Sequence, residues 1–167
     1  LVLNTDESVS QGSVDTAIDV TVTNLAIESD SGIDIDANVS TLAINNADAA
    51  SNVRIDSTIA ALSSGSVTTS AGALAGVTAA GSITIAGAAA ISVDNAVTAN
   101  GGGITLTTST GDLTINADVL AATAGTGSVN LQAGDDVLLN SGTVQSFGTG
   151  DFRIDAGTST GTGVFTM

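Results

Sequence analysis

A pattern that recurs about every 20 residues constrains the fold of this chain more than any other feature. In each copy two apolar residues flank a single residue, a short polar residue follows, and another apolar residue comes three positions later. The clearest copies begin at Ile33, Val53, Ile91, Leu113 and Val137, and the last of these carries one inserted residue. A degenerate copy begins at Ala71. Such regularity is typical of repeat proteins in which every copy forms the same small structural unit.

The apolar residues that close the copies are expected to stack over one another in the interior. They are Val39, Ile59, Val77, Val97, Val119 and Val144. A second set of apolar-any-apolar triplets keeps step with the first and starts at Ile83, Ile104, Val129 and Phe152, with Leu25 and Leu42 as earlier members. Each repeat thus holds two short alternating strands and a third apolar point, which is one triangular turn of a coil.

These repeats predict an all-β fold, a right-handed single-stranded parallel β-helix (β-solenoid) of about eight coils of roughly 18–25 residues. We expect residues 1–167 to form one such domain. Aromatic residues make up 2% of the chain, whereas hydrophobic residues make up 43%, so the core must be thin and aliphatic. No segment keeps a 3.6-residue apolar spacing, which argues against helices.

Two kinds of corner residue are expected between the strands. The glycine-rich stretches 101–103, 125–127 and 148–150 precede the strands of later coils, and they predict corners with positive φ. The residue after the second apolar position is mostly a short side chain with an acceptor, which predicts a ladder along one corner. Its members are Asp36, Asp56, Leu74, Asp94, Asn116 and Asn140.

The charge and hydropathy of the chain limit the classes of partner that it can bind. A net charge of −15 repels the phosphates of nucleic acids, so nucleic-acid binding is not expected. No run of 18 apolar residues is present, so direct membrane insertion is not expected either. The sequence starts at Leu1 and has no signal-peptide pattern, and we interpret it as a piece of a longer chain.

Catalytic residues are not predicted. Asp135 and Asp136 resemble the adjacent aspartates of polygalacturonase-like enzymes, but those enzymes also need a histidine and a basic motif, and this chain has no histidine or lysine. A lyase needs clustered cations, and Arg54 and Arg153 are expected to lie four or five coils apart. We therefore expect that the protein is not an enzyme, and that Arg54 forms a surface salt bridge with Asp34.

Calcium is the candidate cation for the aspartates, although no obligatory cofactor is expected. Six to eight oxygen ligands are needed, and two groups are predicted to lie close in the stack: Asp34, Asp36 and Asp56, and Asp112, Asp135 and Asp136. The glycine-rich nonapeptide of calcium-binding β-rolls is missing.

An outward threonine row of the ice-binding kind starts at Thr84 and Thr105 but stops at Asn130 and Arg153. Among the aromatic residues, Phe152 is expected to face the core, while Phe147 and Phe165 either fill a widened last coil or form an exposed patch.

Residues 81–142, with their runs of alternating Ile, Thr, Leu and Val between Gly, Asp and Asn corners, resemble the repeat regions of filamentous-haemagglutinin and autotransporter-type bacterial surface proteins. The resemblance implies a secreted or cell-surface bacterial stalk or adhesin, whose partners are neighbouring coils and host or matrix glycans or proteins. A carbohydrate-binding or carbohydrate-active β-helix is the alternative. No helix or proline cap is evident at either end, so the open edges predict end-to-end stacking of identical subunits into filaments.

Overall fold

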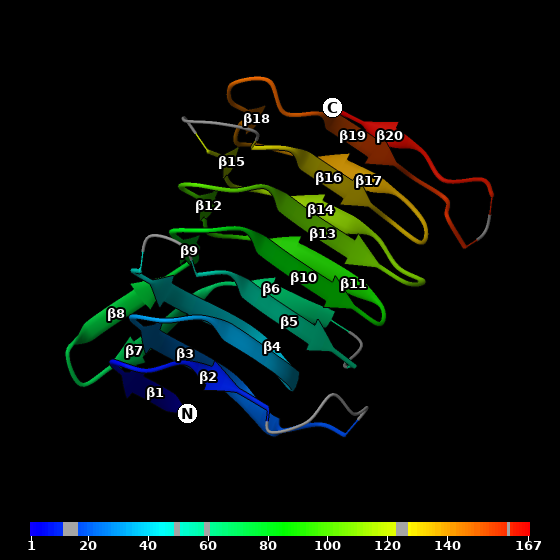
Figure 1. Ribbon diagram of the computed structural model, residues 1–167. Helices are drawn as coiled ribbons and strands as arrows, with labels where there is room; N and C mark the ends of the chain where they lie inside the picture. Colours follow the sequence, from blue (N-terminus) through cyan, green and yellow to red (C-terminus); the bar gives the residue numbers. More distant parts are fainter. Residues whose placement is uncertain (12–16, 49–50, 59–60, 123–126, 160) are drawn as a thin grey trace.

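The computed structural model describes residues 1–11, 17–48, 51–58, 61–122, 127–159 and 161–167. This part of the chain is all-β and contains twenty strands (Figure 1). Eighteen of them form one parallel sheet that coils around an axis, and the other two form an antiparallel hairpin. The prediction of a parallel β-solenoid is confirmed.

Three faces, named A, B and C here, follow one another along the chain in every turn. Face A consists of β2 (Val9–Ser10), residues 33–37 of β4 (Ile33–Asn46), β5 (Val53–Ser57), β10 (Ile83–Gly87), β13 (Ile104–Thr108), β16 (Val129–Gln132) and β19 (Phe152–Asp155). Face B consists of the start of β3 (Val20–Ser29), the middle of β4, β6 (Ala61–Ser64), β11 (Ala90–Val93), β14 (Leu113–Ile115), β17 (Val137–Leu139) and β20 (Phe165–Thr166). Face C consists of β1 (Val2–Thr5), the ends of β3 and β4, β9 (Val77–Ala79), β12 (Val97–Ala99), β15 (Val119–Ala121) and β18 (Val144–Ser146).

The described residues therefore stack seven strands on each face, close to the eight coils expected. Alternation places every second side chain inside, as in β10 and β13, where buried and half-buried residues alternate strictly. Ile83 and Ile104 pair across one layer, and both are buried in the core. Each fully buried aliphatic side chain of this kind contributes about 1.5–3 kcal/mol relative to an exposed one. Stability therefore accumulates along the stack, because each coil covers the next.

The predicted alignment of the closing apolar residues is correct for part of the chain and wrong for its start. Val77, Val97, Val119 and Val144 do align on face C. Val39 is buried but pairs with Val22 on face B, and Ile59 lies outside the described residues. The copies that begin at Ile33 and Val53 lie on face A in register with Ile83, and not on face B with Ile91. The two faces carry the same apolar-any-apolar pattern, which is why the sequence did not separate them.

The degenerate copy at Ala71 is not a coil strand. It belongs to the hairpin of β7 (Ser66–Thr69) and β8 (Gly72–Ala75), inserted between β6 and β9. The hairpin packs outside face C, where Val67 and Leu74 cover Ala26 and Ala43, so these two outward-facing alanines are fully buried. The insertion lengthens the step along face A from Val53 to Ile83 to 30 residues, whereas the next step, from Ile83 to Ile104, is 21.

Glycines act at the corners mainly by close approach. Gly76 closes the hairpin with φ +73°, and a Cβ there would collide with the carbonyl oxygen of Ala96. The expected positive φ is found at Gly148 but not in the stretch 101–103. There a Cβ on Gly101 or Gly103 would lie 2.6 Å from Ala80 O or 2.9 Å from Ser128 O, so the stacked corners leave no room for a side chain.

The last described coil contains two of the three phenylalanines. Phe152 takes an inward position in register with Val129, as expected, yet it is 50% exposed, because none of the described strands lies over it. Phe165 pairs with Val137 and helps to line a hollow of about 170 Å³ at this end, so it partly fills the final coil. Phe147 is half-buried beside Leu120 on the outer side of face C.

Candidate functional site

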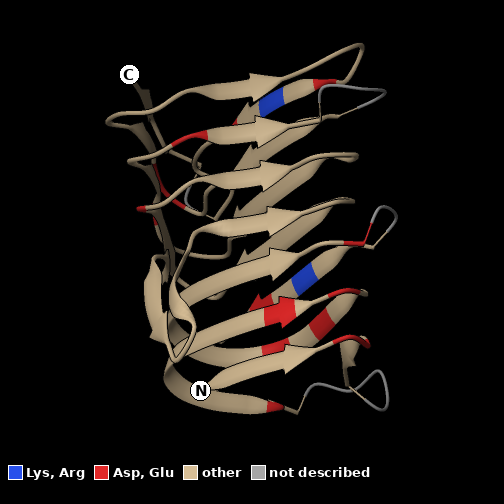
Figure 2. Ribbon diagram, turned by 90° about the vertical axis from the view of Figure 1, so that its left-hand side faces the viewer, with Lys and Arg blue, Asp and Glu red and all other residues tan. Residues whose placement is uncertain are grey.

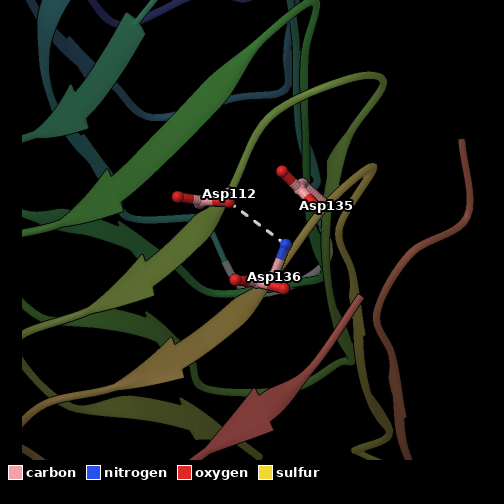
Figure 3. A group of neighbouring side chains, drawn as sticks. All are labelled: Asp112, Asp135 and Asp136. Carbon is pink, nitrogen blue, oxygen red and sulfur yellow. Dashed lines mark hydrogen bonds between the residues drawn. The ribbon is translucent and has the colours of Figure 1, made fainter. Parts of the chain in front are cut away.

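Three carboxylates converge at the corner between faces A and B. Asp112 precedes β14, and Asp135 and Asp136 precede β17, the neighbouring strand in the next layer of the stack (Figure 3). Their carboxylate oxygens lie within 4.8 Å of one another, and all three residues are half-buried. This is the second of the two groups predicted from the sequence, and stacking brings it together although 23 residues separate Asp112 from Asp135 in the chain.

The local fold fixes these side chains through backbone contacts. The N–H of Asp136 donates to Oδ1 of Asp112 at 3.1 Å, and the N–H of Val164 donates to Oδ1 of Asp136 at 2.8 Å. Nearby, the N–H of Gly134 donates to Oγ1 of the buried Thr108 at 3.0 Å. The carboxylates of Asp112 and Asp136 each accept a backbone N–H group from the next layer of the stack. These contacts give both side chains a structural role.

The corner can supply part of a cation shell. Carboxylate oxygens are the ligands that calcium and magnesium prefer, but calcium takes six to eight of them. Three side chains leave the remaining positions to water or to backbone carbonyls, and two of the three already accept backbone N–H groups. Calcium at Asp112, Asp135 and Asp136 remains a prediction from the sequence.

The first predicted group, Asp34, Asp36 and Asp56, has a different environment. Arg54 projects outward from β5 between two layers and bonds to Asp34 at 2.6 Å, and it also pairs with Asp56. The hydrogen bond that Arg54 donates to Asp34 is the main cause that raises the pKa of Arg54, and the charges of the neighbouring aspartates add to it. The predicted Arg54–Asp34 salt bridge is confirmed. Within the described ranges, these three aspartates do not form a cluster with ligand spacing, and a protein cation, Arg54, pairs with Asp34 and Asp56.

The two arginines share one outward row on face A. In this row Asp34, Arg54, Thr84, Thr105, Asn130 and Arg153 follow one another layer by layer. Arg54 and Arg153 are therefore four layers apart, about 19 Å at the usual strand spacing, as the two blue segments in Figure 2 illustrate. Arg153 pairs with Asp155 at 2.5 Å instead. The row also contains acidic, basic, hydroxyl and amide side chains. As expected from the sequence, Thr84 and Thr105 therefore do not continue into a longer row of threonines.

A ladder of short polar side chains runs along the corner at the end of face B. Asp94 accepts hydrogen bonds from Ser63 and Ser92, both at 2.6 Å, and from Asn116 at 2.8 Å. Asn140 in turn donates to Asn116 at 3.0 Å. The hydrogen bond from Ser63, followed by that from Ser92, lowers the pKa of Asp94.

This ladder confirms the predicted one for Asp94, Asn116 and Asn140 and corrects its earlier members. Asp36 and Asp56 lie in another column, on face A, and Leu74 lies in the hairpin. The layer below contributes Ser63 instead, which is in register with Ser92 and donates from there to Asp94. The sequence analysis did not predict this contact, although Leu62 and Ile91 show the same apolar position in β6 and β11.

Comparison with known proteins gave no match to any family model, to any curated protein or to any solved structure. Over the residues described, no helix has the length and apolar character needed to cross a membrane.

Proposed function

We propose that this chain is a structural module of a bacterial surface or secreted protein, a rod that spaces or presents adhesive elements. The observation that carries the proposal is the single aliphatic core, which runs without interruption from Leu25 in β3 to Val137 in β17. Each inner layer is held by backbone hydrogen bonds to both neighbours, as at β10, which pairs with β5 on one side and with β13 on the other. A continuous ladder of this kind suits a stiff spacer, because length is gained by adding layers.

The outer surface agrees with this role. Its charged groups are mostly carboxylates, which are distributed over several layers and corners (Figure 2). A net charge of −15 favours solubility and keeps such rods apart laterally. The likeness of residues 81–142 to filamentous-haemagglutinin and autotransporter-type repeats supports a cell-surface location for the rod.

A mechanical experiment tests the spacer role. Pulling the chain by its two ends should release short segments coil by coil, in line with nearest-neighbour stability. Rupture of the whole chain in one step would contradict the proposal.

Carbohydrate binding is the second candidate, favoured by a shallow hollow on face B. This hollow of about 270 Å³ is lined by Ser40, Ser63, Ser92 and Thr114 together with Ala61, Leu62, Ala90 and Ile91. A panel of polysaccharides decides between the two roles. Retention of a glycan that is lost on Thr114→Ala would favour binding, and release of sugar fragments would favour a carbohydrate-active enzyme.

A further inference from the structure

Asn100 is the only asparagine of the sequence that a glycine follows. It comes directly after β12 on face C, and residues 101–103, all glycine, lead from it to β13 on face A. This corner belongs to an inner layer, because β12 pairs with β9 on one side and with β15 on the other. The N–H of Asn100 donates to Ala79 O at 2.8 Å, so its main chain is held, whereas Asn100 and Gly101 are both exposed to solvent.

The side chain of Asn100 and the nitrogen of Gly101 are both unengaged. In the part of the chain that the structure describes, the amide of Asn100 makes no side-chain hydrogen bond, and the N–H of Gly101 donates to no other group. Gly101 has no Cβ, so no side chain on that residue shields its nitrogen from the Asn100 carbonyl carbon. A nucleophilic nitrogen and a free amide are therefore adjacent and accessible to water.

Asn140 and Asn116, which are exposed at another corner, are held instead. Nδ2 of Asn140 donates to Oδ1 of Asn116 at 3.0 Å, and Nδ2 of Asn116 donates to Asp94 at 2.8 Å. The residue after Asn140 is Ser141, which has a Cβ and whose N–H donates to Ile115 O at 3.3 Å. Asn140 thus has the exposure of Asn100, but both its amide and the following nitrogen are already engaged.

The arrangement at Asn100 permits deamidation through a cyclic imide. The nitrogen of Gly101 attacks Cγ of Asn100, the new N–Cγ bond forms as the Cγ–Nδ2 bond breaks, and the amide proton leaves with the ammonia. Ring closure is intramolecular, which strongly favours it. Water then opens the ring at one of its two carbonyl carbons. Opening at Cγ gives aspartate, and opening at the main-chain carbonyl gives isoaspartate, in which the main chain runs through the former side chain.

We propose that Asn100–Gly101 is a spontaneous modification site of the folded solenoid, where deamidation produces aspartate and isoaspartate at the corner between faces C and A. Overall the reaction consumes one water and releases one ammonia, in keeping with the thermal lability of asparagine. The inference is independent of the proposed scaffold role and goes beyond it. Either product adds a carboxylate to a chain whose net charge is already −15.

Isoaspartate also lengthens the main chain at a corner that is closely packed against its neighbour. A Cβ on Gly101 would lie only 2.6 Å from Ala80 O in the adjacent layer. In the same corner, Gly103 O accepts the N–H of Ile83 at 2.9 Å. An additional main-chain atom shifts this acceptor, so the hydrogen bond to Ile83 should open more often in the isoaspartate form.

Ageing of the full folded chain at mildly alkaline pH, well below its melting temperature, tests the site. A protease that cleaves before aspartate releases residues 94–111, with Asn95 and Asn100, and residues 136–150, with Asn140. Tandem mass spectrometry locates the exchange of NH₂ for OH. We expect conversion at Asn100 to be at least about tenfold faster than at Asn95 or Asn140. New cleavage before residue 100 identifies aspartate, because this protease does not cleave before isoaspartate.

Two variants separate the chemistry from its structural effect. Asn100→Gln keeps an exposed amide but requires a larger ring, so it should remain unmodified and as stable as the wild type in urea. Asn100→Asp supplies the new charge on an unaltered main chain. Hydrogen exchange at the Ile83 amide should be faster in aged than in fresh wild type, and unchanged in aged Asn100→Gln and in fresh Asn100→Asp.

Two outcomes overturn the proposal. If Asn100 reacts no faster than Asn95 and Asn140 in the folded chain, yet reacts rapidly in urea, the corner protects the amide and is not a modification site. If isoaspartate accumulates at residue 100 while exchange at Ile83 stays that of the fresh protein, the argument from the packed corner is wrong. Neither outcome bears on the scaffold role, which the pulling experiment tests separately.

Discussion

The side-chain amide of Asn116 donates to Oδ1 of Asp94 at 2.8 Å, although 22 residues separate the two in the sequence. The contact joins successive layers of one corner, and Ser63 and Asn140 extend it by a layer on each side. Lateral hydrogen bonds of this type add to the backbone ladder and hold each corner over the next.

Asp94→Asn should reduce stability in a pH-dependent way. Hydrogen bonds from Ser63 and Ser92 lower the pKa of Asp94 in the folded chain, so its contribution is present above the unfolded pKa of about 3.9 and is lost as the pH falls through the folded value. The loss at pH 7 should stay below about 1 kcal/mol, because the carboxylate is largely exposed. Urea unfolding followed by circular dichroism at neutral and acid pH measures it. The exposed Asp151→Asn is the control, and a gap between wild type and Asp94→Asn that stays constant with pH would contradict the explanation.

Asp135→Asn should stabilise the chain at low ionic strength. The substitution removes one of three like charges within 4.8 Å but leaves the hydrogen bonds to Asp112 and Asp136 in place. The gain should be a few tenths to about 1 kcal/mol and should shrink with added salt. Thermal unfolding in chelator and in calcium measures it. If a calcium ion bridges the group, added calcium should reverse the order of the two proteins, and an equal response of both excludes such a bridge.

Leu113→Ala should cost about 2–5 kcal/mol, because the side chain is fully buried in the middle of the stack and leaves a cavity. Leu138→Ala is a matched control on the same face one layer away, where the side chain points outward and is half-exposed. It should cost less than half as much in urea unfolding. Equal losses would mean that the inward and outward assignments are wrong.

Gly76→Ala should destabilise the chain by roughly 1–3 kcal/mol, because φ is +73° and the new Cβ would collide with the carbonyl of Ala96. Gly32→Ala provides the comparison, since its Cβ would lie 3.7 Å from Asn52 O, an ordinary contact. That variant should change the free energy of unfolding by less than about 0.5 kcal/mol. A Gly76→Ala protein as stable as Gly32→Ala would contradict the steric argument.

Deletion of residues 66–75, which joins Gly65 to Gly76, should leave the solenoid folded. The N–H of Gly76 already donates to Gly65 O at 2.8 Å, so the two ends of the hairpin meet. The deletion uncovers Ala26 and Ala43 and should lower the melting temperature modestly. The far-UV spectrum should keep its β character, and its loss would show that the hairpin is needed for the coil to form.

Periodicity predicted the fold because inward residues must recur once per coil, and Ile83, Ile104 and Val129 do so in register. It also predicted the cluster at Asp112 and the pair of Arg54 with Asp34, because both follow from stacking one coil on the next. The periodicity did not show to which face of the solenoid each strand at the start of the chain belongs. β4 passes through all three faces as one strand of 14 residues, so no break in the pattern marks its corners.

The hairpin was missed for a related physical reason. Its alternation of small and apolar residues resembles that of a coil strand, and only the covering of Ala26 and Ala43 by Val67 and Leu74 distinguishes the two. Burial on the outside of a face is a long-range property, which spacing along the chain does not encode. The exposure of Phe152 in the last described coil likewise depends on what lies above it.

The hairpin has a consequence for how such a rod can change. The chain leaves the coil at Gly65 and returns at Gly76 beside it, and the layers on either side keep their pairing from β5 to β10 and from β6 to β11. The ten residues of the hairpin, 66–75, are thus accommodated without displacing the neighbouring layers. A corner with this property separates the evolution of the exterior from that of the interior, so that new surface loops can be gained or exchanged there while the rod beneath them stays the same.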